Sequence, residues 1–176
     1  VIALISGGGS ALLVSPAEGL SLADLQGLTA SLLACGATIN EMNCLRKHCS
    51  GVKGGQLARA VAPATLITLV LSDVIGSPLD VIASGPTVPD SSTWADAWAL
   101  VEKYDLAGKL PPAIVARLQA GLRGEIPDTP DGSDPVFAYS QTVVVADSFL
   151  AAQAAKGAAE ERGYRCLLLT TFLDGD

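Results

Sequence analysis

The sequence has few positive charges, few aromatic residues and a single histidine. Its 176 residues hold 11 Lys or Arg against 18 Asp or Glu, so the formal net charge is −7 and the pI is about 4.6. A nucleic-acid-binding surface needs a basic footprint, which this balance does not supply. One histidine cannot build a multi-histidine metal site. We therefore expect neither a nucleic-acid partner nor a histidine-based metal centre.

Paired cysteines, membrane segments and an initiator methionine are missing as well. The cysteines show no metal-ligand spacing such as C-x-x-C, and their pattern is typical of small apolar residues in a reducing compartment: Cys35, Cys44, Cys49 and Cys166. No apolar run reaches the length of a membrane span, and no signal peptide is visible. We expect a cytoplasmic protein without a membrane partner. Because both ends lie in or beside apolar runs, we also expect a fragment of a longer protein.

The residues that are present indicate one core-rich domain. Apolar residues are 49% of the chain and charged residues 16%. Continuous apolar runs at 1–6 and 65–72 are typical of parallel strands covered on both faces. Further strands are expected at 136–146 and 166–171, and helices at 21–36, 38–50, 56–61, 93–104, 111–124 and 148–162. This alternation predicts an α/β fold with three α/β/α layers and a mostly parallel, Rossmann-like sheet.

The segment NCLRKHCSGVKGG, residues 43–55, concentrates positive charge. Apolar residues at helical spacing predict a buried helix face here: Ile39, Met42, Leu45 and Cys49. A neighbouring arc of about 100° carries the polar side chains Asn43, Arg46, Lys47 and Ser50. Lys53 and two glycines follow. The cluster predicts a phosphate or carboxylate site, because Arg binds such anions as a fork and Lys as a point charge. A solvated basic helix face is the alternative.

A glycine-rich loop, Ser6-Gly7-Gly8-Gly9-Ser10, follows the first expected strand and precedes apolar residues of helical character. Strand, glycine loop and helix in this order direct backbone N–H groups at an anion. The loop lacks the lysine and spacing of a Walker A motif and does not fit G-x-G-x-x-G. An ordinary tight turn is therefore the alternative.

Asp73 follows the strand expected at 65–72. Ligands of open α/β sheets bind at the carboxyl ends of the strands, so Asp73 is a candidate for Mg²⁺ binding or for contact with a substrate hydroxyl. A turn or capping role is the alternative. The loop at 76–90 adds polar groups and prolines, and loops of this length are usually functional. Within this region we prefer Asp73 to Asp80 and Asp90.

Three long segments, in this order, resemble the glycerate 2-kinase family: LISGGGSALL (4–13), GATINEMNCLRKHCSGVKGGQLA (36–58) and LSDVIGSPLDVIASGPTVPDSST (71–93). This is the class II glycerate kinase group, whose members carry a C-terminal MOFRL domain and are often labelled hydroxypyruvate reductase. The resemblance is strong over 1–93 and looser over the remainder, where YRCLLLTT (164–171) also matches.

The resemblance implies ATP-dependent phosphorylation of D-glycerate at its 2-hydroxyl group, with ATP and Mg²⁺ as cofactors. It also implies that residues 1–176 are the central part of an N-terminal α/β domain, without an upstream segment and the MOFRL domain. The family's site lies in a cleft between two domains, so residues from the missing parts would complete it. Whether the chain alone is active, and whether it forms a homodimer, stays open.

Roles for individual residues follow as expectations from the resemblance. The loop residues would hold a phosphate or carboxylate: Ser6, Gly7, Gly8, Gly9 and Ser10. Four side chains would neutralise phosphoryl oxygens or the glycerate carboxylate, with Arg46 and Lys47 among the catalytic residues: Asn43, Arg46, Lys47 and Lys53. Asp73, also catalytic, would hold Mg²⁺ or accept the hydroxyl proton, and Ser84, Gly85 and Thr87 would complete the pocket. Such a division suits phosphoryl transfer, which depends mainly on positioning and charge stabilisation.

Two other functions remain open. An NAD(P)H-dependent hydroxypyruvate reductase would match the label sometimes used for the family, but the sequence has no dinucleotide fingerprint with an acidic residue downstream. A non-catalytic module for small acids would keep the cationic helix and would not need Asp73.

His48 could serve as a base, but its expected position on the helix favours a structural hydrogen bond.

Overall fold

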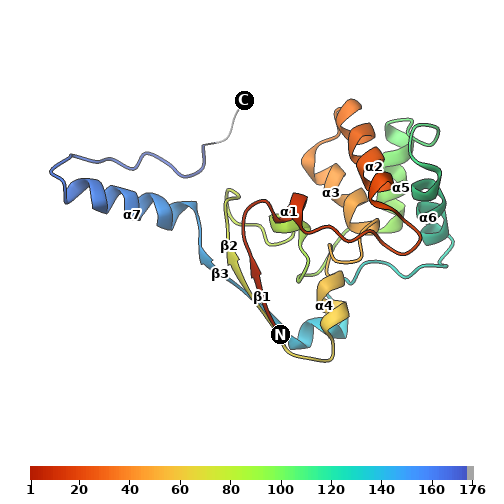
Figure 1. Ribbon diagram of the computed structural model, residues 1–176, viewed down its shortest axis with the longest axis horizontal. Helices are drawn as coiled ribbons and strands as arrows, with labels where there is room; N and C mark the ends of the chain where they lie inside the picture. Colours follow the sequence, from red (N-terminus) through yellow and green to blue (C-terminus); the bar gives the residue numbers. More distant parts are fainter. Residues whose placement is uncertain (174–176) are drawn as a thin grey trace.

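The computed structural model describes residues 1–173 and contains a parallel sheet of three strands. The strands are β1 (Ile2–Ile5), β2 (Leu66–Leu71) and β3 (Ser140–Ala146), in the order β1-β2-β3. Leu4 pairs with Leu69, which in turn pairs with Val143. Helices flank this sheet, so the expected α/β fold with a parallel sheet is confirmed (Figure 1).

The helices agree with the sequence pattern to within about two residues at most ends. They are α1 (Gly9–Leu12), α2 (Leu22–Ala34), α3 (Ile39–His48), α4 (Gln56–Val61), α5 (Trp94–Lys103), α6 (Pro112–Leu122) and α7 (Ser148–Glu160), with 3₁₀ turns η1 (Ile82–Ser84) and η2 (Pro135–Tyr139). None of the helices formed by residues 1–173 is long and apolar enough to cross a membrane.

Two expected strands differ from the structure. Residues 136–139 form part of η2, because the Asp134 side chain accepts a hydrogen bond from the Val136 N–H and starts a helical turn. The strand expected at 166–171 is absent. Leu167 and Leu169 are 80% and 84% exposed, and the segment pairs with none of the described strands. An apolar run alone does not make a strand when no neighbouring strand supplies hydrogen bonds.

Three helices begin with the same reciprocal capping box. In each, a Ser or Thr hydroxyl accepts from the N–H three residues later, and an acidic side chain there accepts from the capping N–H. The pairs are Ser21 with Asp24, Thr38 with Glu41, and Thr93 with Asp96. Each cap stabilises its helix by about 1 kcal/mol, which fixes the starts of α2, α3 and α5.

The main core lies among α2, α3, α5 and α6, to one side of the sheet (Figure 1). Leu28 and Leu32 of α2 pack there with Leu45 of α3, whose burial the helical spacing predicts. Trp94 and Val101 are also buried in this core, so the aromatic face of α5 has a packing role. The expected burial of Ile39 is wrong: it lies at the start of α3, is 57% exposed and lines a cavity. Leu22, at the start of α2, is likewise more than half exposed and lines another cavity.

One face of the sheet is open in this chain. Along β2, Leu66, Thr68 and Val70 are buried, whereas alternate residues are more accessible. On β1, Leu4 is 75% exposed. The expectation that strands 1–6 and 65–72 are covered on both faces is therefore wrong for this chain, since the described helices leave one face accessible.

Candidate functional site

The glycine loop joins β1 to α1 and brings a carboxylate close to its backbone. Gly8 has a positive φ of 80° and caps α1, a conformation that favours glycine. A Cβ atom on Gly7 would overlap the Asp73 carboxylate, so any larger residue here would force the Asp73 side chain to move. A Cβ atom on Gly9 would lie 2.8 Å from the Ala83 Cβ atom. The loop is thus packed between Asp73, which lies two residues after the end of β2, and the turn η1.

A cavity of about 230 Å³, which we call the glycine-loop cavity, opens at this point. Its lining includes all five loop residues, together with Ile39 and Asn43 of α3, Asp73, Val74 and residues 81–83. The loop, Asp73 and one member of the polar arc of α3 therefore meet at the carboxyl edge of the sheet. Residues with backbone amides, a side-chain amide and a carboxylate line one small volume, a combination that can hold an anion and a hydroxyl group.

A second cavity, the Lys47 cavity, adjoins the first. It measures about 700 Å³ and shares Asn43, Val74 and Val81 with the glycine-loop cavity. Lys47 and Asp80 belong to its lining. Lys47 and Asp73 therefore lie in neighbouring hollows that have a common wall.

Lys47 is buried and is held by a residue that sequence reasoning ranked below Asp73. Its Nζ atom donates to Asp90 Oδ1 at 3.1 Å, and Asp90 is only 2% exposed. Asp90 also accepts from the Ser92 N–H and hydroxyl and from the Thr129 hydroxyl. These hydrogen-bond donors hold the Asp90 carboxylate in one orientation, and the carboxylate in turn positions the Lys47 ammonium. Only the length of the 76–90 loop hinted at this partner, because residues 47 and 90 are far apart in sequence.

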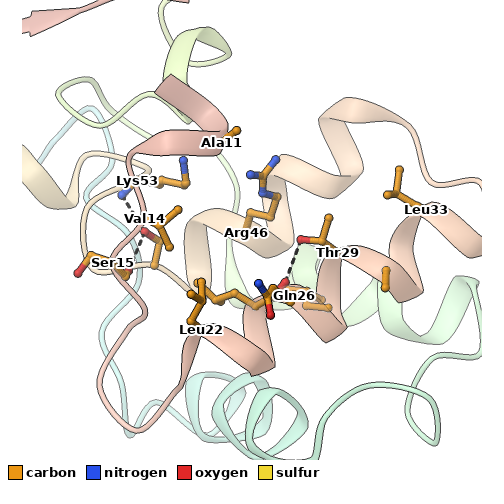
Figure 2. Close-up of a pocket in the computed structure, with 13 residues that line it drawn as sticks. Ala11, Val14, Ser15, Leu22, Gln26, Thr29, Leu33, Arg46 and Lys53 are labelled. Carbon is orange, nitrogen blue, oxygen red and sulfur yellow. Dashed lines mark hydrogen bonds between the residues drawn. The ribbon is translucent and has the colours of Figure 1, made fainter. Parts of the chain in front are cut away.

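Arg46 and Lys53 line neither the glycine-loop cavity nor the Lys47 cavity. The Nη2 atom of Arg46 and the Nζ atom of Lys53 both donate to the Ser10 carbonyl oxygen, at 2.8 and 2.9 Å. Both line a third cavity of about 450 Å³ between α1 and α2, the α2 cavity (Figure 2). Burial, and secondarily the neighbouring Arg46, lower the pKa of Lys53 to about 8. The cations of the 43–53 segment are therefore divided between two cavities, with Lys47 in one and Arg46 and Lys53 in the other.

The 83–85 segment begins in the wall of the glycine-loop cavity with Ala83 and contacts α3 through Ser84. Ala83 and Ser84 have positive φ values of 53° and 61°, which are uncommon for residues other than glycine. The Ser84 and Gly85 carbonyl oxygens accept from the N–H groups of Gly54 and Gly55. The Ser84 hydroxyl donates to Asn43 Oδ1 at 3.2 Å, which orients that amide. Strain of this kind persists when surrounding contacts determine the conformation.

Thr87 and His48 lie away from the cavities. The Thr87 hydroxyl oxygen is 3.4 Å from the hydroxyl oxygen of Thr142 on β3. His48 is buried, and both of its ring nitrogens contact oxygens. Nδ1 lies 2.8 Å from the Cys44 carbonyl oxygen, and Nε2 lies 2.9 Å from Asp128 Oδ1. These contacts give His48 the structural role that its position on the helix indicates.

The cysteines agree with a packing role in part. All four are free; Cys44 and Cys49 are buried, whereas the other two are intermediate in exposure. Burial raises the pKa of the Cys44 thiol to about 11 and that of Cys49 to about 12. Neither thiol is therefore activated as a nucleophile.

The carboxylates at these cavities suit Mg²⁺ only if a bound substrate supplies further oxygen ligands. Asp73 is exposed at the glycine-loop cavity and Asp80 lines the adjoining one. Within residues 1–173, no group of three or more His, Cys, Asp or Glu residues could hold a metal ion. Mg²⁺ commonly binds one or two carboxylates together with waters and substrate phosphates. Asp73 therefore fits an ion that arrives with a phosphate group.

Several known proteins are similar to this chain. It is 42% identical over 176 residues to the glycerate 2-kinase of Pyrococcus horikoshii and covers 39% of that protein. It is 45% identical over 176 residues to a putative hydroxypyruvate reductase of Agrobacterium vitis, of which it covers 38%. The crystal structure of a glycerate kinase from Thermotoga maritima matches with a TM-score of 0.81 and 40% identity, over 98% of this chain and 39% of that one.

The chain thus spans 38–39% of the length of these relatives. Residues 1–119 match the family model described as "Domain of unknown function (DUF4147)". This match covers the glycine loop, α3 and Asp73, all of which contribute to the glycine-loop cavity. The chain belongs to the glycerate kinase family.

Proposed function

We propose that this chain is part of an ATP-dependent kinase that phosphorylates D-glycerate at its 2-hydroxyl group to give 2-phosphoglycerate. The observation that carries the proposal is the glycine-loop cavity, where Gly7 leaves room for the Asp73 carboxylate against the loop. The names of the P. horikoshii and T. maritima relatives support the same reaction.

Each part of the site has a role in this proposal. Backbone amides of the glycine loop and the Asn43 side chain bind anionic oxygens in the glycine-loop cavity. Lys47, oriented by Asp90, supplies positive charge from the adjoining cavity. Asp73 either holds Mg²⁺ or accepts the proton of the glycerate hydroxyl group. Mg²⁺, when bound, would neutralise charge on the phosphate oxygens. Arg46 and Lys53 steady the loop through Ser10 and add positive charge behind it.

We further propose that residues 1–176 form the central part of a longer α/β domain, which an upstream segment and a C-terminal domain complete. Two observations support this. The chain covers only 39% of its P. horikoshii relative, and one face of its sheet carries exposed aliphatic side chains such as Leu4 and Leu71. Water-exposed apolar faces of this kind are usually covered by further protein.

A single assay separates the kinase from its alternatives. The chain, and the full gene product where it is longer, is incubated with D-glycerate, ATP and Mg²⁺, and ³¹P NMR identifies the product. The proposal predicts ADP and 2-phosphoglycerate. Oxidation of NAD(P)H with hydroxypyruvate would support the reductase, and glycerate binding without any product would support a binding module.

Asp73→Asn tests the assignment within that assay. We expect turnover to fall by at least about tenfold, which corresponds to about 1.4 kcal/mol of transition-state stabilisation. The matched control is Asp105→Asn, since Asp105 is an exposed carboxylate that lines none of the three cavities. Unchanged turnover in Asp73→Asn would assign the role to another residue.

A further inference from the structure

The α2 cavity differs in chemistry from the two cavities beside Asp73. Most of its wall is aliphatic, from Ala11, Val14, Leu22, Leu25, Leu28 and Leu33. Gln26 and Thr29 add polar groups from α2, and Figure 2 shows both beside the apolar side chains of that helix. The residues that line the cavity include no Asp or Glu. Its volume of about 450 Å³ is within the usual range of small-molecule sites.

Two cations in this cavity lack an acidic partner. Among residues 1–173, neither Arg46 nor Lys53 takes part in a salt bridge. Each donates to the same Ser10 carbonyl oxygen, which leaves further N–H groups of the guanidinium and the ammonium. Burial lowers the pKa of both groups, so their charged forms carry a desolvation cost. A bound anion would offset that cost.

We infer that the α2 cavity binds a nucleoside triphosphate, with its base against α2 and its phosphates beside Arg46 and Lys53. This inference rests on the proposed kinase function. It places the nucleotide in the α2 cavity and D-glycerate in the glycine-loop cavity. The apolar wall suits a flat base, and a glutamine amide such as Gln26 can pair with the amino and ring nitrogens of adenine. An apolar peptide in the same place would leave both cations unpaired.

The position of Ser10 connects this cavity to the chemistry. Its carbonyl oxygen contacts Arg46 and Lys53, and the residue itself lines the glycine-loop cavity. Phosphates bound by Arg46 and Lys53 would therefore be separated from the glycine-loop cavity, which Asp73 lines, only by the backbone around Ser10. The nucleotide enters along α2, and D-glycerate occupies the glycine-loop cavity.

The test measures nucleotide and glycerate binding separately, by calorimetry, with ¹⁵N NMR shifts to locate each ligand. ADP, adenosine and tripolyphosphate are titrated into the chain and into the full gene product where it is longer. Ala30→Trp fills the cavity from an exposed position on α2, and Arg46→Gln removes one cation. Ala99→Trp, at an exposed position on α5, is the matched control.

We expect ADP affinity to fall by at least about tenfold in Ala30→Trp and in Arg46→Gln, equivalent to about 1.4 kcal/mol each. Glycerate affinity in Ala30→Trp, and ADP affinity in Ala99→Trp, should stay within about twofold of wild type. ADP should shift amide signals of α2 and residues 10–15, and both adenosine and tripolyphosphate should bind more weakly than ADP.

Three results would overturn the inference: unchanged ADP affinity in Ala30→Trp, ADP-induced shifts confined to other elements, or no ADP binding by folded protein. These differ from failure of the kinase proposal. If ADP binds in the α2 cavity but glycerate is never phosphorylated, the nucleotide site stands and the kinase fails. If glycerate is phosphorylated and Ala30→Trp keeps the wild-type KM for ATP, the kinase stands and this inference fails.

Discussion

Lys47 and Asp90 form the pair of residues on which the charge of the site depends. Their side chains are 3.1 Å apart and almost fully removed from solvent. Removing one member of such a pair leaves the other charge buried and unbalanced, which commonly costs about 3–5 kcal/mol. The serine and threonine donors around Asp90 add to the cost of losing its carboxylate.

A double-mutant cycle measures this coupling. We expect Lys47→Met and Asp90→Asn each to lower the free energy of unfolding by about 3 kcal/mol, because each leaves an unpaired charge or unsatisfied donors. The double variant should lose clearly less than the sum, since neither charge remains. Urea unfolding followed by circular dichroism gives the values. Strictly additive losses would show that the two side chains do not act as a pair.

At the scale of single elements, α3 is the helix that brings the site together. Its capping box fixes where it starts. Glu41 in that box also accepts hydrogen bonds from the Lys103 ammonium, at the end of α5, and from the hydroxyl group of Tyr104, the residue after α5. These hydrogen bonds hold the start of α3 against the end of α5. With the start of α3 fixed, Asn43 and Lys47 line the Lys47 cavity, whereas Arg46 lines the α2 cavity.

Acidification should weaken this connection. The Lys103 ammonium, followed by the Thr38 backbone and hydroxyl groups, lowers the pKa of Glu41 from 4.5 to about 2. Stability from a carboxylate with a lowered pKa is present above pH 4.5 and is lost as the pH falls towards 2. We expect Glu41→Gln to lose less stability over that range than the wild type, in thermal unfolding measured at each pH.

The control for that series is Glu161→Gln, which removes an exposed carboxylate after α7. It should keep the acid dependence of the wild type. If Glu41→Gln and Glu161→Gln have the same pH profile as the wild-type chain, the Glu41 carboxylate does not support the fold.

Helical periodicity and caps were sufficient to predict the positions of α2, α3 and α5, because these signals are local. Leu22 and Ile39 fit the same apolar pattern, yet they line cavities, since no local rule distinguishes a core position from the mouth of a pocket. The contact between Gly7 and Asp73 and the salt bridge of Lys47 depend on segments distant in sequence. The sequence identifies these residues as candidates for the site, but local patterns do not show which of them contact each other.

At the scale of the whole molecule, the open face of the sheet has a mutational signature. Leu4 is mostly exposed in this chain, so Leu4→Glu should change its free energy of unfolding by no more than about 0.5 kcal/mol. In a longer gene product that covers this face, the same change would bury a charge and should cost several times more. Denaturant unfolding of both proteins gives the comparison. An equal, small effect in both would show that the face stays open.

The central claim for the molecule is that the glycine loop and Asp73 form one reaction site. Gly7→Ala tests it directly, because the added methyl group must displace the Asp73 carboxylate from the loop. Gly108→Ala is the matched control, since its methyl group would meet no atom within 4 Å. The measurement is the rate of ADP formation from ATP and D-glycerate by each variant of the full gene product. We predict a loss of at least about tenfold in Gly7→Ala and the wild-type rate in Gly108→Ala, whereas a wild-type rate in folded Gly7→Ala would contradict the account.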